Sequence, residues 1–386
     1  MKSPAHFDTL CIHGGQSPCP STGAVMPPIY LSSTFKQPAP GEHLGFEYSR
    51  TGNPSRQAYE KCMAEIEYGQ QAFAFSSGMA AISTIIEMLE PGDHIITGND
   101  LYGGTYRLFN RVKTRSQQLQ FSFVNTQTLD EVISAKRPNT RILWLETPSN
   151  PLLQISPIEP LCAWAKANDI ITVIDNTFAS PWIQNPLKMG CDIVVHSATK
   201  YLNGHSDVVG GIVIVGQSPQ LCEQMAFLQN SCGAVASPFD SYLVLRSLKT
   251  LPLRMQKHCD NALKLAEWLN SHPQIEHVIY PGLAHHPQHN LAKQQMRHFG
   301  GMISIIIKGD PMAFLKNCQL FTLAESLGGV ESLIEHPASM THASIPADVR
   351  RQIGIDDGLI RLSVGVEHYQ DLQDDLNFAL KRLIAK

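Results

Sequence analysis

The middle of the chain alternates short apolar runs with amphipathic stretches of helical period. Apolar residues spaced three and four apart after Met79 predict a helix that reaches Leu89, and a second helix is predicted over 158–168. The apolar runs predict strands at 72–75, 94–97, 142–145, 171–174, 193–195 and 212–215. This strand, helix, strand order requires crossover connections, and continuous apolar strands fit a sheet covered on both faces. We therefore expect residues 51–235 to form an α/β domain with a mainly parallel sheet covered by helices.

The two ends of the chain have different patterns. Residues 1–50 are rich in Gly, Pro, Ser and Thr and have little periodicity, which predicts an arm, ordered or not, rather than a domain. Residues 236–386 begin with a long predicted helix from Ser241 to Asn270. Strand candidates then follow at 275–279, 302–307 and 359–364. This pattern predicts a smaller C-terminal α+β domain.

Composition narrows the classes of protein. The chain has 386 residues, 43% apolar and 17% charged, so it can bury a large core and is not intrinsically disordered. A net charge of −4 without a basic run argues against nucleic acid or a membrane surface as a partner. Nine cysteines without a C-x-x-C pair favour reduced thiols in a cytoplasmic protein. We expect neither a secretory leader nor a membrane-spanning helix, because no long apolar run occurs.

Polar clusters follow the predicted strands, where open α/β sheets bind their ligands. Ser76-Ser77-Gly78-Met79 opens a helix whose free N–H groups suit a phosphate, although an ordinary serine N-cap also explains the pattern. Asp175 ends an apolar strand, where its carboxylate either finds a cationic partner or caps the next segment. Lys200 follows another strand, where desolvation would lower the pKa of its amine and allow a Schiff base with an aldehyde. The alternative for Lys200 is a solvated surface lysine.

Arg361 is a further candidate, on the strand predicted at 359–364. Strand alternation puts Arg361 and Ser363 on one face, opposite the apolar residues between them. A guanidinium there either holds a carboxylate with two hydrogen bonds or lies at an exposed edge. A phosphate cradle, a carboxylate for a ring nitrogen, a Schiff-base amine and a carboxylate clamp together indicate a pyridoxal 5′-phosphate (PLP) enzyme that acts on an amino acid.

Eight stretches spread over almost the whole chain resemble the Cys/Met metabolism PLP-dependent enzymes of transsulfuration. They are YSRTGNPSR (48–56), SSGMAA (76–81), DLYGGTYRLF (100–109), ETPSNP (146–151), VIDNTFASP (173–181), SATKYLNGHSD (197–207), FTLAESLGGVESL (321–333) and MTHAS (340–344). The resemblance implies PLP as the cofactor and the aspartate-aminotransferase-like architecture known as fold type I.

The resemblance also implies roles for the residues that would contact the cofactor. Lys200 would form the Schiff base, Asp175 would pair with the pyridine nitrogen, and Tyr102 would stack on the ring. The phosphate would be bound by Gly78, Met79, Ser197 and Thr199, and by Tyr48 and Arg50 from a neighbouring subunit. The family therefore implies a homotetramer whose active sites are shared between subunits.

The substrate side is implied in the same way. Arg361, Asn150 and Ser326 would hold the substrate carboxylate and the cofactor edge. Glu325 and Arg107 would line the distal end of the substrate pocket. The implied substrate is a sulfur-containing amino acid. Glu331 and Glu335 fit either the surface or the pocket.

Four segments resemble the cystathionine γ-lyases of this family: LQNSCGAVASPFD (228–240), LRSLKTLPLRM (245–255), YPGLAHHPQH (280–289) and GLIRLSVGVE (358–367). That branch converts cystathionine to cysteine, 2-oxobutanoate and ammonia. Cystathionine γ-synthases and β-lyases share nearly all the catalytic residues and remain alternatives. Thr51 stands where some synthases that use succinylated homoserine have a second Arg, and Glu325 stands where enterobacterial-type β-lyases tend to have an aromatic residue.

Two alternative functions outside this family have less support from the sequence. Ser197-Ala198-Thr199-Lys200 matches the S-x-x-K pattern of serine acyl-transferases, but the companion S-D-N and K-T-G motifs are missing. His285, His286 and His289 suggest a metal site, but Pro287 interrupts any helix there and no Cys or carboxylate has suitable spacing. We therefore expect no metal.

Overall fold

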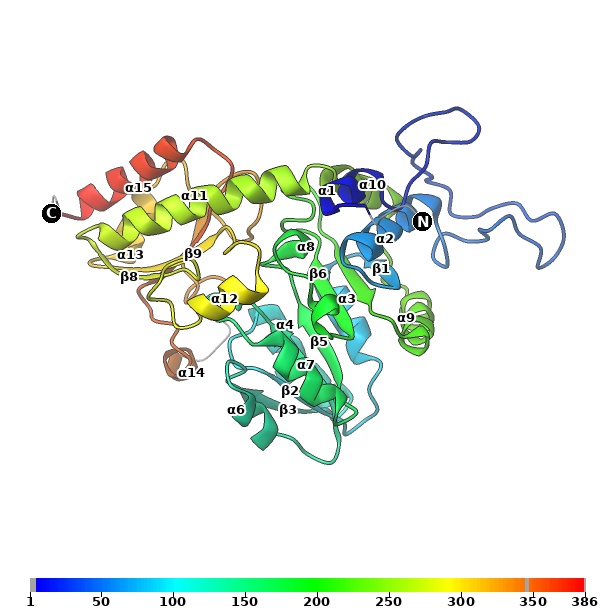
Figure 1. The fold of residues 1–386 in the computed structure, drawn as a ribbon, viewed down its shortest axis with the longest axis horizontal. Coiled ribbons are helices and arrows are strands. Elements are labelled where there is room, and N and C mark those ends of the chain that lie inside the picture. Colours follow the sequence, from blue (N-terminus) through cyan, green and yellow to red (C-terminus); the bar gives the residue numbers. More distant parts are fainter. Residues whose placement is uncertain (1–4, 344–346, 385–386) are drawn as a thin grey trace.

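The structure is a computed structural model that describes residues 5–343 and 347–384 (Figure 1). It contains two β-sheets. The larger sheet has seven strands in the order β1-β7-β6-β5-β4-β2-β3. Within it β7 runs antiparallel to both neighbours, and the other pairs are parallel. The predicted mainly parallel sheet is confirmed. Its strands are β1 (Gln71–Phe75), β2 (His94–Gly98), β3 (Gln120–Val124), β4 (Thr140–Glu146), β5 (Ile171–Asp175), β6 (Ile193–Ser197) and β7 (Gly211–Val215).

Helices cover both faces of this sheet, which explains why its strands are continuously apolar. Along β4, Leu143 and Leu145 belong to one buried cluster, whereas Ile142 and Trp144 belong to the cluster on the other face. The helical elements of this region are α2 (Pro54–Ile66), α3 (Gly78–Ile86), α4 (Gly103–Arg107), the π-helical turn η1 (Leu108–Lys113), α5 (Thr114–Ser116), α6 (Leu129–Ser134), α7 (Ile158–Lys166), α8 (Ser180–Ile183), the 3₁₀ turn η2 (Pro186–Met189) and α9 (Pro219–Cys232).

The smaller sheet has five strands in the order β10-β11-β12-β9-β8. It is antiparallel except for the pair β10 and β11, and it confirms the α+β character expected after residue 236. The strands are β8 (Ile275–Ile279), β9 (Met302–Ile307), β10 (Thr322–Leu323), β11 (Leu333–Glu335) and β12 (Leu359–Ser363). The helices are α10 (Pro238–Leu248), α11 (Leu251–Ser271), α12 (His289–Gln295), α13 (Pro311–Asn317), α14 (Ala347–Gln352) and α15 (Tyr369–Ile384).

The single long helix predicted from Ser241 to Asn270 is wrong, because α10 and α11 are separate helices. Pro252 lies in the first turn of α11, where the missing N–H costs nothing, but it could not serve as an interior residue of one continuous helix. α11 contacts both α8 and β8. In Figure 1 it extends along the top of the molecule from the small sheet toward α1 and α10.

The N-terminal segment contains one short helix, α1 (Phe7–His13), which the sequence pattern does not predict. Between α1 and α2 the chain is irregular, and Figure 1 shows it extending away from the two sheets as long blue loops. The domain limits at residues 50 and 235 stay predictions. α10 lies just past the second limit but packs against α2 of the large-sheet region.

Candidate active site

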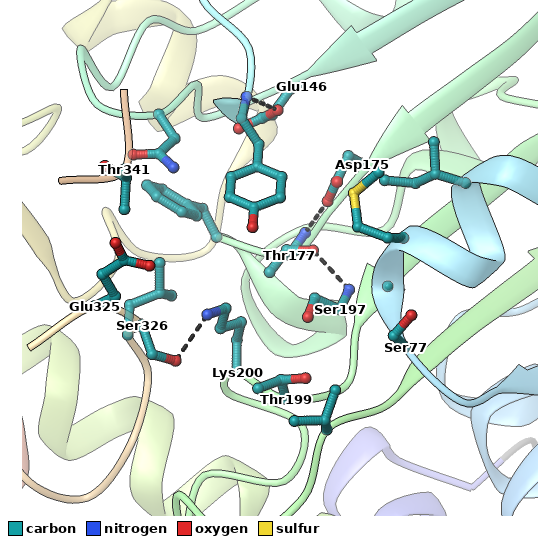
Figure 2. A pocket seen from close by; sticks show the side chains of 18 of the residues that line it. Ser77, Glu146, Asp175, Thr177, Ser197, Thr199, Lys200, Glu325, Ser326 and Thr341 are labelled. Carbon is teal, nitrogen blue, oxygen red and sulfur yellow. Dashed lines mark hydrogen bonds between the residues drawn. The ribbon is translucent and has the colours of Figure 1, made fainter. Parts of the chain in front are cut away.

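Polar residues from the ends of four strands of the large sheet line one cavity of about 230 Å³. Ser77 follows β1, while Glu146, Asp175 and Ser197 end β4, β5 and β6. Figure 2 shows these side chains around the cavity, with Lys200, Glu325, Ser326 and Thr341 on its other sides. Eleven residues predicted to bind cofactor or substrate line it: Gly78, Met79, Tyr102, Asn150, Asp175, Ser197, Thr199, Lys200, Glu325, Ser326 and Arg361.

The N-terminus of α3 forms one side of the cavity. Ser77 is the N-cap, and its Oγ accepts a hydrogen bond from the backbone N–H of Ala80 at 3.0 Å. A Cβ on Gly78 would lie only 3.0 Å from the Cβ of Ser197, so glycine allows α3 and β6 to approach each other closely. Free N–H groups of α3 therefore face the same space as the Ser197 and Thr199 hydroxyls, which suits a phosphate.

Two carboxyl groups lie side by side at the end of the sheet, because Glu146 of β4 and Asp175 of β5 are register partners. Asp175 accepts a hydrogen bond from the Thr177 N–H at 3.0 Å, and Glu146 accepts one from the Tyr102 N–H at 2.9 Å. Burial raises the pKa of both groups, and the charge of Asp175 raises the pKa of Glu146 further. A cationic ring nitrogen beside Asp175 would offset this cost, so the donor set fits a pyridinium.

Lys200 lies in the turn after β6, and its Nζ donates a hydrogen bond to Ser326 Oγ at 2.7 Å. Burial lowers the pKa of this amine to about 8, and the positive charge of Arg361 contributes to the decrease. The solvated-lysine alternative is wrong, since Lys200 lines the cavity. An amine with this pKa is partly neutral near neutral pH, as attack on an aldehyde requires.

Arg361 lies in β12 and is buried, with a side chain only 2% exposed, so the exposed-edge alternative is wrong. Its Nη1 donates to Asn150 Oδ1 at 2.9 Å, and its Nη2 donates to the Ser326 carbonyl at 2.9 Å. Nη1 also lies 2.9 Å from Glu335 Oε1 in a buried ion pair. The guanidinium is thus held at the cavity wall by three partners.

Three predicted residues do not line the cavity of the described chain: Tyr48, Arg50 and Arg107. Tyr48 is 46% exposed, and Arg50 stacks over its ring and donates to Asn230. Arg107 ends α4, one turn beyond Tyr102, and its charge opposes the effect of burial, which raises the pKa of Tyr102. The reach of Tyr48 and Arg50 into a neighbouring subunit stays a prediction.

Several residues of this site were not predicted from the sequence. Glu146 follows an apolar strand as Asp175 does, so the same pattern could have identified it. Thr177 follows β5 and links it to β6, because its Oγ1 accepts a hydrogen bond from the Ser197 N–H at 2.9 Å. Thr341 lines the cavity within the MTHAS motif, of which Ser344 lies outside the described residues. Of the two glutamates that fit either the surface or the pocket, Glu335 is buried beside Arg361, and Glu331 is exposed.

The two alternative functions, a serine acyl-transferase and a metal-binding protein, gain no support from the structure. Lys200 Nζ donates to Ser326 rather than to Ser197, the hydroxyl that an S-x-x-K site would activate. Across residues 5–343 and 347–384, no cluster of three or more His, Cys, Asp or Glu is arranged to hold a metal ion. Within the same ranges no helix is long and apolar enough to cross a membrane.

Comparison with known proteins agrees with this geometry. A family model described as Cys/Met metabolism PLP-dependent enzyme matches residues 8–381. The cystathionine β-lyase of Coxiella burnetii is 58% identical over 379 residues, which cover 97% of this chain and 98% of that protein. The cystathionine γ-lyase of Dictyostelium discoideum is 50% identical over 378 residues, covering 97% of each.

The solved structures agree as well. The crystal structure of cystathionine γ-lyase from Lactobacillus plantarum complexed with L-serine matches with a TM-score of 0.96 and 48% identity, covering 98% of this chain and 100% of that one. The predicted fold type I and the PLP cofactor are thereby confirmed. The chain belongs to the Cys/Met metabolism PLP-dependent enzyme family, as a transsulfuration enzyme of the cystathionine lyase group.

Proposed function

We propose that this enzyme cleaves cystathionine at the γ-carbon–sulfur bond, giving cysteine, 2-oxobutanoate and ammonia. The observation that carries the proposal is the meeting of Lys200 and Arg361 in one cavity, since Ser326 bonds to both through its hydroxyl and its carbonyl. This places an amine that can move protons next to a cation that can hold an amino-acid carboxylate. When bound, PLP supplies an aldehyde that condenses with an amine and an electron-withdrawing ring.

The residues around the sheet end would hold the cofactor. The N–H groups of Gly78 and Met79, with the hydroxyls of Ser197 and Thr199, would bind its phosphate. Asp175 would keep the proton on its ring nitrogen, and Tyr102 would stack on the ring. Tyr48 and Arg50 would complete the phosphate site from a neighbouring subunit of a homotetramer, in which the irregular N-terminal segment has a partner to contact.

The residues from the small sheet would hold the substrate. Arg361 and Asn150 would bind its α-carboxylate, and Ser326 would orient the Lys200 amine. Glu325 lines the cavity and, with Arg107, would meet the amino and carboxylate groups at the far end of cystathionine. Once free, the Lys200 amine would remove the Cα proton and then a Cβ proton, as γ-elimination requires.

The resemblance of four segments to γ-lyases and the presence of Glu325 support the γ-carbon as the point of cleavage. Cleavage at the β-carbon is a second candidate, because the Coxiella burnetii relative, 58% identical, is named a β-lyase. The two reactions use the same cavity and differ in which half of cystathionine carries the reacting nitrogen.

The test is to incubate the purified holoenzyme with L-cystathionine and identify the products. We expect cysteine and 2-oxobutanoate in equal amounts. Homocysteine and pyruvate would instead establish the β-lyase reaction. If neither pair forms but an O-acyl-homoserine and cysteine are joined, the enzyme is a γ-synthase.

A further inference from the structure

Glu335 lies directly across from Arg361 in the small sheet, since the two residues are register partners of the antiparallel strands β11 and β12. Both side chains are almost completely buried, with exposed fractions of 1% and 2%. Glu335 Oε1 lies 2.9 Å from Arg361 Nη1 and also accepts a hydrogen bond from Thr341 Oγ1 at 2.9 Å. One carboxylate oxygen therefore contacts both the guanidinium and a residue that lines the cavity.

The partners of Arg361 show which of its N–H donors stay available when it contacts Glu335. A guanidinium has five N–H donors: one on Nε and two on each Nη. Asn150 Oδ1 accepts a hydrogen bond from Nη1, Glu335 Oε1 forms an ion pair with the same nitrogen, and the Ser326 carbonyl accepts a hydrogen bond from Nη2. Among the described residues, Nε has no hydrogen-bond partner. Nε is therefore free to donate, and with Nη2 it forms one edge of the planar group, a shape that matches the two oxygens of a carboxylate.

From this count we propose that Glu335 is a positioning residue, which fixes the rotation of Arg361 so that its Nε and Nη2 edge stays available for the substrate carboxylate. The proposal deepens the proposed function and rests on Arg361 as the carboxylate clamp. Without Glu335, Nη1 would lose one of its two partners, and the guanidinium could turn so that its donors no longer match a carboxylate. Burial makes this orientation sensitive, because Arg361 has no bulk water to replace a lost acceptor.

A binding experiment separates positioning from general support of the fold. The holoenzyme is titrated with L-alanine, which has a carboxylate but no leaving group, and with ethylamine, which is alanine without its carboxylate. The absorbance of the bound cofactor reports both dissociation constants. For Glu335→Ala we expect alanine to bind about tenfold more weakly. Glu335→Gln, which keeps an acceptor oxygen, should lose about threefold. Ethylamine should bind all variants within about twofold of the wild type.

The matched control is Glu331→Gln, which changes an exposed glutamate of the same segment that contacts Ser206 instead of Arg361. It should leave both constants unchanged. Equal weakening of alanine and ethylamine by the Glu335 variants, or no weakening of either, would overturn the positioning role. If Glu335→Ala does not fold, Glu335→Gln is judged by the same outcomes. Arg361→Lys tests the underlying function: unchanged alanine binding in that variant would refute the clamp itself, whereas weakened binding there with none in the Glu335 variants would refute only the inference.

Discussion

The two walls of the cavity are built in different ways. The cofactor wall, formed by Ser77, Gly78, Asp175 and Ser197, lies where β1, β5 and β6 of the large sheet end. The substrate wall, formed by Arg361, Ser326 and Thr341, depends on a charged side chain inside a strand of the small sheet. The first wall offers backbone N–H groups and hydroxyls that the sheet topology places together. The second wall offers a buried cation, Arg361, which is paired with Glu335 of another strand.

Lys200 joins the two walls, because it follows a strand of the first and donates to Ser326 of the second. Lys200→Ala should have the largest effect of any substitution, since by our proposal Lys200 supplies both the amine that captures the cofactor and the base. We expect turnover to fall by about 10⁴-fold or more, together with loss of the absorbance of lysine-bound cofactor. The control Lys188→Ala changes an exposed lysine that lies over the Tyr68 ring. Near-normal turnover in Lys200→Ala would refute the assignment.

A substitution deep in the cofactor wall should separate activity from stability. Asp175→Asn removes the charge that would keep the ring nitrogen protonated, so kcat should decrease by roughly 10²- to 10³-fold. The apoenzyme should melt at the wild-type temperature or above, because the charge of Asp175 raises the pKa of the buried Glu146 and its removal relieves that repulsion. Thermal melting of the apoenzyme, measured beside steady-state rates, checks both statements. A large drop in melting temperature would show that Asp175 is chiefly structural.

A substitution in the substrate wall should change KM rather than cofactor binding. Arg361→Lys keeps the charge beside Glu335 but lacks the planar fork, so KM for cystathionine should increase by about 10- to 100-fold. The absorbance of the bound cofactor should stay as in the wild type, because the substitution changes a side chain of the substrate wall only. Loss of the cofactor from this variant would mean that the two walls are not separable.

A further prediction is a pH dependence of cofactor capture by the apoenzyme. Burial, followed by the charge of Arg361, lowers the pKa of Lys200 to about 8. Only the neutral amine attacks an aldehyde, so the rate of PLP capture should increase up to tenfold per pH unit below 8 and level off above it. Stopped-flow absorbance between pH 6 and pH 9 measures the profile. A rate that keeps increasing through pH 9 would indicate an ordinary, solvated lysine.

The cofactor wall was the more predictable half of the site. Asp175 and Lys200 each follow an apolar run, and strand order alone brings such residues to one edge of a sheet. For Arg361, strand alternation identified a distinct face but could not decide between a clamp and an exposed edge, because burial depends on which strands lie beside it. Glu335 lies in a strand of three residues, too short for any periodic pattern, and its partner is 26 residues away in sequence.

The elements of the fold were also predictable only where the local sequence determines them. The six apolar strands were predicted because each is buried on both faces, whereas β3 was not, and four of its five residues are only partly buried. The break between α10 and α11 was missed because apolar spacing continues through it, although Pro252 marks the start of the second helix. Elements that are determined by the local sequence could thus be predicted, and contacts between distant segments could not.

By our proposal, the amine of Lys200 is the group that holds PLP in this cavity. The direct measurement is to reduce the holoenzyme with borohydride, which fixes the cofactor to the amine it is joined to, and to map the modified peptide by mass spectrometry. We expect a pyridoxyl group on Lys200 in stoichiometric amount. A modification on any other lysine, or none, would contradict it.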